Sequence, residues 1–463
     1  MIRRTIRDIA AMIGADHATD LPETSVQGVC TDTRTVTPGA LFVPIRGPRF
    51  NGHHYAADAL AKGAAAALWE KGEPGRPDHP AVIEVDDALA ALQRLAREYR
   101  RQIGATVIGI TGSNGKTSTK DMLAALLSTT FRTHKTNGNL NNHLGVPLTL
   151  LGMEENTEMA VVEMGMSALG EIAALATIAE PDAAIITSVS EVHLGDLGTR
   201  ERIVQAKLEI VGPLRPGGLL AYCGDYPQLE EEIGRSGFRG KRIAYGVQPS
   251  NELRPLHWRA DDSGFAFVLD EREPDKFAAP IHGRHQMVNA LGAIAVARHF
   301  GVPEQSIREG LYGAALSGLR NEVVRVGECL ILNDAYKSNP ASVRAALQTL
   351  YDFRKPKRKI AVLGDMVELG EESEQLHRDL GRELDPGRID LVVTVGASAA
   401  RMGEEAVPRF GADRVAICAD KEQAIARLLR ETLDDCVVLL KGSRVLGLES
   451  IEQALRDKGA VGR

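Results

Sequence analysis

The sequence feature that most constrains the fold is a glycine-rich segment at residues 111–118. It reads Thr111-Gly112-Ser113-Asn114-Gly115-Lys116-Thr117-Ser118. An apolar run suited to a β-strand precedes it at 105–111, and a helical pattern follows at 120–127. A strand, a tight glycine turn and a helix in this order are typical of a parallel α/β sheet whose first loop binds phosphate. The segment therefore predicts both an α/β fold and a phosphate site.

The residue types in this loop indicate nucleotide chemistry. Glycines allow backbone N–H groups to close around phosphate oxygens, and the helix N-terminus adds a favourable partial charge. Lys116 is expected to reach the terminal phosphates, and the Thr117 hydroxyl is expected to bind Mg²⁺. The longer form of this motif has glycine at position 110, where this chain has Ile110, so the match is to a shorter form. A glycine turn without a ligand is the alternative, and the Lys-Thr pair speaks against it.

Strand and helix patterns alternate along the chain, and 463 residues suggest about three domains. Residues 1–103 are expected to form a small α/β domain, and residues 104–317 a central P-loop mononucleotide-binding domain with a mostly parallel sheet. Residues 318–463 are expected to form a C-terminal Rossmann-like domain. The expected helices are 55–67, 88–103, 201–214, 287–299, 341–351 and 374–384. The further expected strands are 41–45, 159–164, 183–188, 218–222, 329–332, 360–363, 391–395, 415–418 and 437–440, with a β-rich segment at 240–283.

Composition excludes several classes of protein. The formal charge is −7, from 55 basic and 62 acidic residues without a basic run, which argues against a nucleic-acid-binding surface. No apolar stretch of about 20 residues escapes a charge or a Gly/Pro break, so no membrane span is expected. The N-terminus has no apolar signal core behind its charged start. Five scattered cysteines without a C-x-x-C pair predict buried, reduced thiols in a cytoplasmic protein.

Two polar residues follow predicted strands and are candidate metal ligands. Glu163 ends the strand at 159–164, and His193 follows the strand at 183–188. Ligands bind at the carboxyl ends of parallel strands, so Glu163 would hold Mg²⁺ beside Thr117. The alternatives are a solvated glutamate at a strand end and a histidine with a structural role.

Lys207 interrupts an apolar surface. On the helix expected at 201–214, it projects into the middle of an arc formed by Ile203, Val204, Leu208, Ile210, Val211 and Leu214. A buried ammonium is costly unless it is paired or chemically altered. Two interpretations stay open: the side chain extends along the surface to water, or it serves an active site, with or without chemical modification.

Three further segments carry a resemblance to a known family. They are Lys135-Thr136-Asn137-Gly138-Asn139-Leu140-Asn141-Asn142-His143-Leu144-Gly145-Val146-Pro147, Asn333-Asp334-Ala335-Tyr336-Lys337-Ser338-Asn339-Pro340-Ala341-Ser342 and Leu363-Gly364-Asp365-Met366-Val367-Glu368-Leu369-Gly370 with Leu376-His377. Together with the loop at 112–117, they resemble the Mur ligases, ATP-dependent amide-forming enzymes of bacterial cell-wall synthesis. The resemblance covers essentially the whole chain and favours the branch that adds D-alanyl-D-alanine. The second segment departs from the family pattern at Lys337, where asparagine is usual.

The resemblance implies roles for individual residues. Thr117, Glu163 and His193 would hold Mg²⁺, and Lys207 would be the lysine that several members carbamylate, so that Lys116, His193 and Lys207 would be catalytic. The ATP site would comprise Gly112, Ser113, Asn114, Gly115, Lys116, Thr117, Ser118, Asn289, Arg320, Asp334 and Tyr336. The substrate site would comprise Thr31, Asp32, Thr33, Arg34, Arg46, Asn51, Gly52, His53, Asn139 and Asn142. Without the family, the first-domain residues would be surface turns.

The resemblance also implies the reaction. A monomeric ligase would join D-alanyl-D-alanine to UDP-N-acetylmuramoyl-tripeptide through an acyl phosphate, using ATP and Mg²⁺ and releasing ADP and phosphate. A sister ligase that adds one amino acid and a folylpolyglutamate synthase are alternatives, against which the segments at 135–147 and 334–342 speak. A P-loop ATPase acting as a switch would hydrolyse ATP without an amine, and it leaves the first and third domains unexplained. The third peptide residue, meso-diaminopimelate or lysine, stays open.

Overall fold

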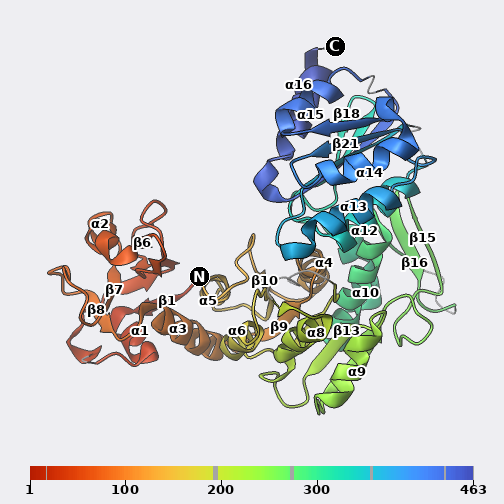
Figure 1. The fold of residues 1–463 in the computed structure, drawn as a ribbon. Helices are drawn as coiled ribbons and strands as arrows, with labels where there is room; N and C mark the ends of the chain where they lie inside the picture. Colours follow the sequence, from red (N-terminus) through yellow and green to blue (C-terminus); the bar gives the residue numbers. More distant parts are fainter. Residues whose placement is uncertain (17, 191–196, 272–275, 355–357, 432–433, 462–463) are drawn as a thin grey trace.

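The computed structural model describes residues 1–16, 18–190, 197–271, 276–354, 358–431 and 434–461. Figure 1 shows three lobes in chain order, with the first standing apart and the third seated on the second. Each lobe is built on its own β-sheet with helices around it, which confirms the expected α/β architecture of three domains. No helix within the described ranges is long and apolar enough to cross a membrane.

The first lobe contains a four-stranded parallel sheet in the order β3-β4-β7-β8. Its strands are β3 (Val29–Cys30), β4 (Leu41–Phe42), β7 (Ala66–Glu70) and β8 (Val82–Val85). Two antiparallel pairs add β1 (Arg3–Thr5) with β2 (Ser25–Gln27) and β5 (Arg46–Gly47) with β6 (Phe50–Asn51). The helices are α1 (Ile6–Ile13), η1 (Ala18–Asp20), η2 (Gly52–Tyr55), α2 (Ala56–Ala61) and α3 (Ala88–Ile103).

The helix expected at 55–67 is wrong in its second half. α2 ends at Ala61, and β7 begins at Ala66. Gly63 turns the chain between them with a φ of +98°, a conformation that glycine adopts at little cost. Ala66 and Ala67 are fully buried in the sheet, so packing overrides the helix preference of alanine.

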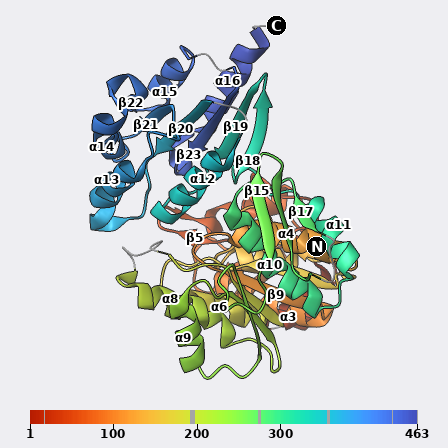
Figure 2. The same cartoon turned by 90° about the vertical axis from the view of Figure 1, so that its right-hand side faces the viewer.

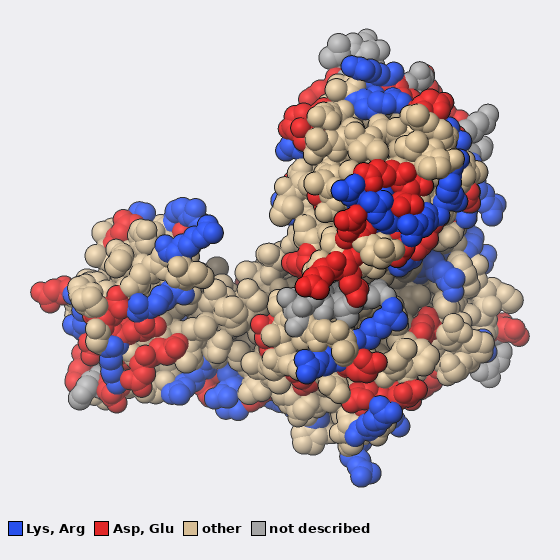
Figure 3. Space-filling view, in the orientation of Figure 1, with Lys and Arg blue, Asp and Glu red and all other residues tan. Residues whose placement is uncertain are grey.

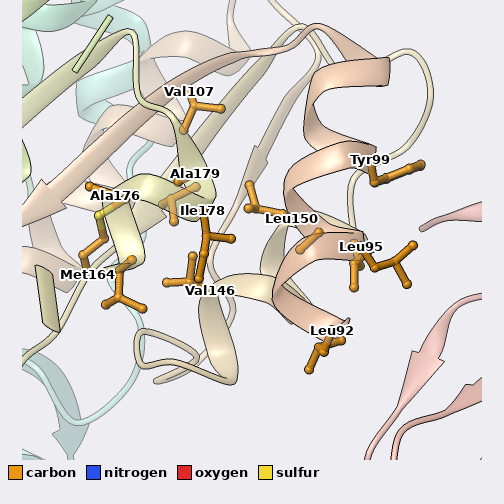
Figure 4. Packing of buried hydrophobic residues seen from close by; sticks show 14 of the residues in the cluster. Leu92, Leu95, Tyr99, Val107, Val146, Leu150, Met164, Ala176, Ile178 and Ala179 are labelled. Atoms are coloured by element: carbon orange, nitrogen blue, oxygen red, sulfur yellow. The ribbon is translucent and has the colours of Figure 1, made fainter. Parts of the chain in front are cut away.

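Helix α3 joins the first lobe to the second. Its N-cap Asp87 accepts a hydrogen bond from the Ala90 amide. Figure 4 shows its apolar side meeting the middle lobe in one buried cluster, which includes Leu92, Leu95, Tyr99, Val107, Val146, Leu150 and Ile178. The Tyr99 hydroxyl donates to the Met153 carbonyl at 2.9 Å. The first lobe is therefore fixed to the second through a shared core.

The middle lobe contains a six-stranded parallel sheet in the order β10-β11-β9-β12-β13-β14. Its strands are β9 (Thr106–Thr111), β10 (Thr133–Lys135), β11 (Met159–Glu163), β12 (Ala183–Ile186), β13 (Leu219–Cys223) and β14 (Lys241–Tyr245). Its helices are α4 (Lys116–Ser128), α5 (Gly145–Leu151), α6 (Glu171–Ala179), α8 (Arg200–Leu208), η3 (Glu209–Val211), α9 (Pro227–Arg235), α10 (Arg284–His299) and α11 (Glu304–Tyr312).

Alternating apolar residues of this sheet bury two faces. Ile108 and Ile110 share a cluster with α4 and α10, whereas Val107 shares another with α3, α5 and α6. The β-rich segment expected at 240–283 is confirmed by β14 and by a small antiparallel sheet of β15 (His257–Asp261), β16 (Gly264–Val268) and β17 (Phe277–Ala279).

The third lobe has a six-stranded sheet in the order β18-β19-β23-β20-β21-β22. Five strands are parallel, and the edge strand β18 (Glu322–Val326), which the sequence pattern did not indicate, is antiparallel. The others are β19 (Cys329–Asp334), β20 (Arg358–Gly364), β21 (Leu391–Val395), β22 (Val415–Cys418) and β23 (Cys436–Lys441). The helices are α12 (Pro340–Asp352), η4 (Gly370–Glu372), α13 (Ser373–Glu383), α14 (Ala400–Phe410), η5 (Ala412–Arg414), α15 (Lys421–Leu428), η6 (Arg444–Leu446) and α16 (Glu449–Val461).

The cysteines are buried and free, as their spacing in the sequence predicts. On the face drawn in Figure 3, basic and acidic side chains are interspersed, and open space separates the first lobe from the third. Figure 2 shows the third lobe above the middle one from a second direction. The five cysteines, all within the described ranges, are buried thiols without disulfide bonds.

Candidate active site

The glycine-rich loop joins β9 to α4 at the carboxyl end of the middle sheet. Gly112 has a φ of +146°, and Gly115, the N-cap of α4, has a φ of +84°. A Cβ at Gly112 would lie 2.0 Å from Thr187 Oγ1, and a Cβ at Gly115 would lie 2.4 Å from Asn289 Oδ1. Only glycine fits both positions. The loop therefore combines the helix N-terminus with a tightly packed backbone, as a phosphate cradle requires.

Lys116 begins α4 and folds back over the loop. Its Nζ donates to the carbonyl oxygens of Gly112 at 2.7 Å and Ser113 at 3.4 Å. Burial, together with the charges of Lys337 and Arg320, lowers the pKa of Lys116 to about 8, whereas Glu163 opposes the shift. An anion bound at the loop would favour the charged ammonium, so this lysine is suited to a phosphate ligand.

Glu163 ends β11 and is 2% exposed. Its Oε1 accepts a hydrogen bond of 2.8 Å from Asn141 Nδ2, and its amide donates to Thr136 Oγ1 at 3.0 Å. Oε2 is buried without a hydrogen-bond partner among the described residues. An orphaned carboxylate oxygen is costly unless a ligand completes it.

Glu163 and Thr117 line the same cavity. A carboxylate and a hydroxyl are oxygen donors of the kind that Mg²⁺ takes together with water and phosphate, so these residues fit the ion. Within the described ranges, no group of three or more His, Cys, Asp and Glu side chains forms a metal cluster. His193, the third expected ligand, lies outside the described residues.

Lys207 is 1% exposed on α8. Its burial excludes the interpretation in which the side chain extends to water. Burial, together with the charges of Lys116 and Lys337, lowers the pKa of Lys207 well below its ordinary value. The helix expected at 201–214 is too long: α8 ends at Leu208 and η3 at Val211, before Gly212 and Pro213, because proline has no backbone N–H to donate to a carbonyl of the preceding turn.

The loop borders a cavity of 630 Å³ between the middle and third domains. Residues 113–118, Asn139, Asn142 and Glu163 line it from the middle domain, and Arg320, Tyr336, Lys337 and Glu368 line it from the third. Gln93 of α3 also reaches its wall and donates to the His143 carbonyl at 3.1 Å. The predicted substrate residues Asn139 and Asn142 thus meet the predicted phosphate loop.

A second pocket of 260 Å³ lies on the other side of the loop. The structure brings four predicted nucleotide residues together there: Asn289, Arg320, Asp334 and Tyr336. The Arg320 guanidinium carbon lies 3.8 Å from the centre of the Tyr336 ring, a close cation–π contact. Asn114, Gly115 and Ser118 of the loop line the same pocket. Residues about 200 positions apart thus form one concave surface around the loop.

A buried cation that the sequence motifs did not indicate orders this pocket. Lys441 is 1% exposed, and its Nζ contacts Asp334 Oδ2 at 3.2 Å and donates to the carbonyl of Lys337. It ends β23, so the strand-end rule that found Glu163 would also have found Lys441. Its ammonium fixes the backbone that carries Tyr336 and Lys337.

A second missed residue is Asp121 on α4. Its Oδ2 accepts hydrogen bonds from the backbone amide of Ser317 at 2.8 Å and its hydroxyl at 2.7 Å, and its Oδ1 contacts Lys135 Nζ at 2.6 Å. Ser317 precedes the third domain by one residue in the expected division. The loop's own helix therefore anchors the segment that leads to Arg320.

The predicted first-domain residues form a separate group outside both pockets. Asp32 and Arg34 make an ion pair of 2.6 Å in an exposed turn after β3. Arg46 pairs with Glu73 at 2.7 Å, and Asn51 Nδ2 donates to the same carboxylate at 2.6 Å. Asn51 Oδ1 lies 2.8 Å from His53 Nδ1. Thr31, Thr33 and Gly52 lie in the same turns. Figure 1 places this group in the first lobe, away from the phosphate loop.

Known proteins match this arrangement over its whole length. Three family models match: the Mur ligase family catalytic domain at residues 25–100, the Mur ligase middle domain at 110–297, and the Mur ligase glutamate ligase domain at 319–444. UDP-N-acetylmuramoyl-tripeptide–D-alanyl-D-alanine ligase of Bacillus subtilis is 42% identical over 457 residues, covering 98% of this chain and 99% of that protein.

Solved structures agree. A crystal structure of MurF from Acinetobacter baumannii superimposes with a TM-score of 0.88 at 30% identity, covering 99% of both chains. MurF ligase from Thermotoga maritima in complex with ADP has a TM-score of 0.82 at 28% identity, covering 95% of this chain and 99% of that one.

Proposed function

The chain belongs to the Mur ligase family, and from that premise we propose that it joins D-alanyl-D-alanine to UDP-N-acetylmuramoyl-tripeptide, with cleavage of ATP to ADP and phosphate. It is an ATP-dependent ligase of peptidoglycan precursor synthesis. The observation that carries the proposal is the phosphate loop between two adjoining pockets, each lined by residues of the middle and third domains. One pocket suits a nucleotide, and the other leaves room for two further substrates.

The reaction needs no protein nucleophile. The terminal carboxylate of the tripeptide attacks the γ-phosphorus of ATP, giving an acyl phosphate and ADP. The amine of D-alanyl-D-alanine then attacks the acyl carbon and expels phosphate. Catalysis rests on positioning and on the neutralisation of charge around the transferred group, where Lys116 supplies a buried cation at the loop.

The smaller pocket is the proposed nucleotide site. Residues 112–118 would hold the phosphates, Asn289 would contact adenine, and Arg320, Asp334 and Tyr336 would meet the nucleotide from the third domain. Their gathering around Gly115 supports this assignment. Buried side chains hold two of these residues in place: Lys441 pairs with Asp334, and Asp121 accepts hydrogen bonds from the segment before Arg320.

Mg²⁺ is the proposed metal, held by Thr117 and Glu163, with His193 as a further ligand. The ion supplies positive charge that polarises the terminal phosphate. The orphaned Oε2 of Glu163 supports this choice. Lys207 is the proposed site of carbamylation, which replaces a buried ammonium by an anion; its lowered pKa leaves a larger fraction of neutral amine for that reaction.

The first domain is the proposed grip on the uridine nucleotide, through Thr31, Asp32, Thr33, Arg34, Arg46, Asn51, Gly52 and His53, while Asn139 and Asn142 would meet the peptide end. The proposed division is 1–103 for this domain, 104–317 for the ATP domain and 318–463 for the closing domain that binds the dipeptide. We further propose that the protein is a monomer and that it is cytoplasmic.

Phosphate release and product mass test the function. The full chain should release phosphate from ATP only when UDP-N-acetylmuramoyl-tripeptide and D-alanyl-D-alanine are both present, and the product should gain the mass of the dipeptide minus water. Release without the dipeptide, and without ligated product, would refute the assignment. Single amino acids offered in place of the dipeptide test the sister-ligase alternative.

A further inference from the structure

Lys337, like Arg320 and Tyr336 of the same domain, lies between the two pockets. It lines both the cavity of 630 Å³ and the pocket of 260 Å³. Asn114 and Gly115 of the phosphate loop also line both. A side chain from the third domain therefore lies near the loop at the boundary of the two pockets. There the last phosphate of a nucleotide in the smaller pocket would face the cavity of 630 Å³. At this position the sequence departs from the asparagine that the resemblance leads one to expect.

The Lys337 backbone is fixed, whereas its ammonium is held loosely. The Lys337 carbonyl accepts a hydrogen bond from the buried Lys441. Its Nζ lies 3.0 Å from Glu368 Oε2, in a pair whose side chains are 42% and 52% exposed. Ion pairs with this exposure contribute little to stability, because water screens them and both side chains lose freedom. A better anion can therefore displace Glu368 at small cost.

The partner of this pair is held in an unusual conformation. Glu368 has a φ of +66°, in the left-handed region that non-glycine residues rarely adopt. The preceding backbone is anchored, since the Met366 amide donates to His377 Nε2 at 3.1 Å and the Val367 amide to Ser443 Oγ at 3.3 Å. The anchored turn places the Glu368 carboxylate in the cavity wall, within reach of Lys337.

The surrounding charges favour a polyanion beside Lys337. Lys116 of the loop and Arg320 of the third domain line the cavity of 630 Å³ together with Lys337. Three cations from two domains thus border one cavity, and bringing them together is costly unless an anion compensates. The terminal phosphate of ATP carries that charge.

We propose that Lys337 binds the γ-phosphate of ATP from the third domain, leaving Glu368 to do so, and thereby helps this chain distinguish ATP from ADP. The inference rests on the proposed function and adds a phosphate ligand to it. Lys337 and Lys116 line the same cavity from the two domains, so the γ-phosphate would be held between a lysine of each domain. ADP lacks this group and leaves the pair of Lys337 and Glu368 intact.

The test compares the affinities of the full chain for ADP and for a non-hydrolysable ATP analogue, by calorimetry at fixed Mg²⁺ and ionic strength. In Lys337→Asn, which restores the residue usual in the family pattern, the preference for the triphosphate should fall about tenfold, the size of one charge-assisted hydrogen bond. Lys337→Arg should keep the preference, because the charge is retained. Glu368→Gln should increase it, because the competing anion is removed.

Lys421→Asn, on α15 of the same domain, is the matched control for loss of one positive charge and should keep the wild-type preference. An unchanged preference in Lys337→Asn would overturn the inference. So would an unchanged preference with a raised KM for D-alanyl-D-alanine, which would assign Lys337 to the dipeptide carboxylate. Ligated product from the wild type is measured in parallel: its absence refutes the proposed function, whereas its presence with an unchanged preference refutes only this inference.

Discussion

Asn114 of the phosphate loop and Asn339 of the third domain form a reciprocal amide pair. Asn339 Nδ2 donates to Asn114 Oδ1 at 2.8 Å, and Asn114 Nδ2 donates to Asn339 Oδ1 at 3.3 Å. Asn339 is also the N-cap of α12, whose Oδ1 accepts from the Ser342 amide at 3.0 Å. One side chain therefore begins a helix of the third domain and docks that domain on the proposed phosphate loop.

Asn339→Ser should separate these two roles. Serine is also a good N-cap, so α12 keeps its cap, and the free energy of unfolding should fall only by the about 1–2 kcal/mol that the two lost hydrogen bonds contribute. The shorter side chain cannot reach Asn114, and kcat should fall about tenfold through the loss of two hydrogen bonds across the domains. Thermal unfolding and steady-state kinetics measure the two effects. Because the partners act together, Asn114→Ala should add little to Asn339→Ser; additive losses would contradict the pairing.

Binding of ATP should weaken above pH 8. Burial holds the pKa of Lys116 at about 8 in the nucleotide-free protein, and bound phosphate stabilises the charged ammonium and raises that pKa. Affinity is therefore fully present below pH 8 and falls as the pH rises above it, by at most about tenfold for each pH unit. Calorimetric titration at constant ionic strength measures this slope.

Lys116→Ala should abolish turnover with the fold intact, and its weaker affinity for ATP should no longer depend on pH in this range.

Lys207→Ala should reduce turnover about tenfold or more, the range found for groups that orient metal ligands. If the wild-type lysine is carbamylated, added short-chain carboxylates should restore part of the activity, because they replace the lost anion in the vacated space. Removal of bicarbonate should lower wild-type activity and leave the variant unchanged. A variant with wild-type kinetics would show that the modified-lysine proposal is wrong.

Glu163→Gln should raise the Mg²⁺ concentration needed for half-maximal turnover about tenfold or more. Glutamine can still accept the hydrogen bond from Asn141, so the melting temperature should stay near that of the wild type. The loss falls on Oε2, the oxygen without a partner. Glu158→Gln, at an exposed glutamate before β11, is the control. An unchanged Mg²⁺ requirement in Glu163→Gln would remove Glu163 from the metal site.

The third domain should lose stability in mild acid through His377. This side chain is buried, with Nδ1 2.6 Å from the Ser373 carbonyl and Nε2 accepting from the Met366 amide. Burial lowers the pKa of His377 in the folded state, so its contribution is present above the unfolded value of about 6.5 and is lost as the pH falls below it.

Urea unfolding at pH 7.5 and pH 5 measures this loss. His377→Asn should be less stable at pH 7.5 by about 1–2 kcal/mol because it breaks this bonding, and should show a smaller loss between the two pH values. An equal acid loss in the variant and the wild type would assign the effect to other groups.

The sequence predicted the elements that local patterns encode. The strand, loop and helix around Lys116, the strand ending at Glu163 and five of the six third-domain strands are as expected. The helix prediction at 55–67 was wrong in its second half because Ala66 and Ala67 pair with β4 in a buried sheet. The helix propensity of alanine does not reveal such long-range pairing. β18 was not predicted, because a largely exposed strand at a sheet edge lacks the apolar pattern that identifies a buried strand.

Contacts between distant segments explain the rest. Asn114 and Asn339 are 225 positions apart, and Asp121 and Ser317 are 196 positions apart. Each side chain is an ordinary polar residue of a helix or loop until the domains meet, so no spacing rule could pair them. Lys207 was predicted in part. The helical periodicity indicated its apolar surroundings, but only the fold brings it under the influence of the charges of Lys116 and Lys337.

Because α3 packs the first lobe against the middle lobe, it limits where the chain can be truncated and which domains can be exchanged with those of relatives. Leu92, Leu95 and Tyr99 complete a core that the middle lobe also supplies. A fragment that begins at β9 would expose this apolar surface to water and would tend to aggregate. The first lobe, cut off after α3, would do the same. A chimaera that exchanges the first lobe between relatives must therefore carry this helix together with its matching partner surface.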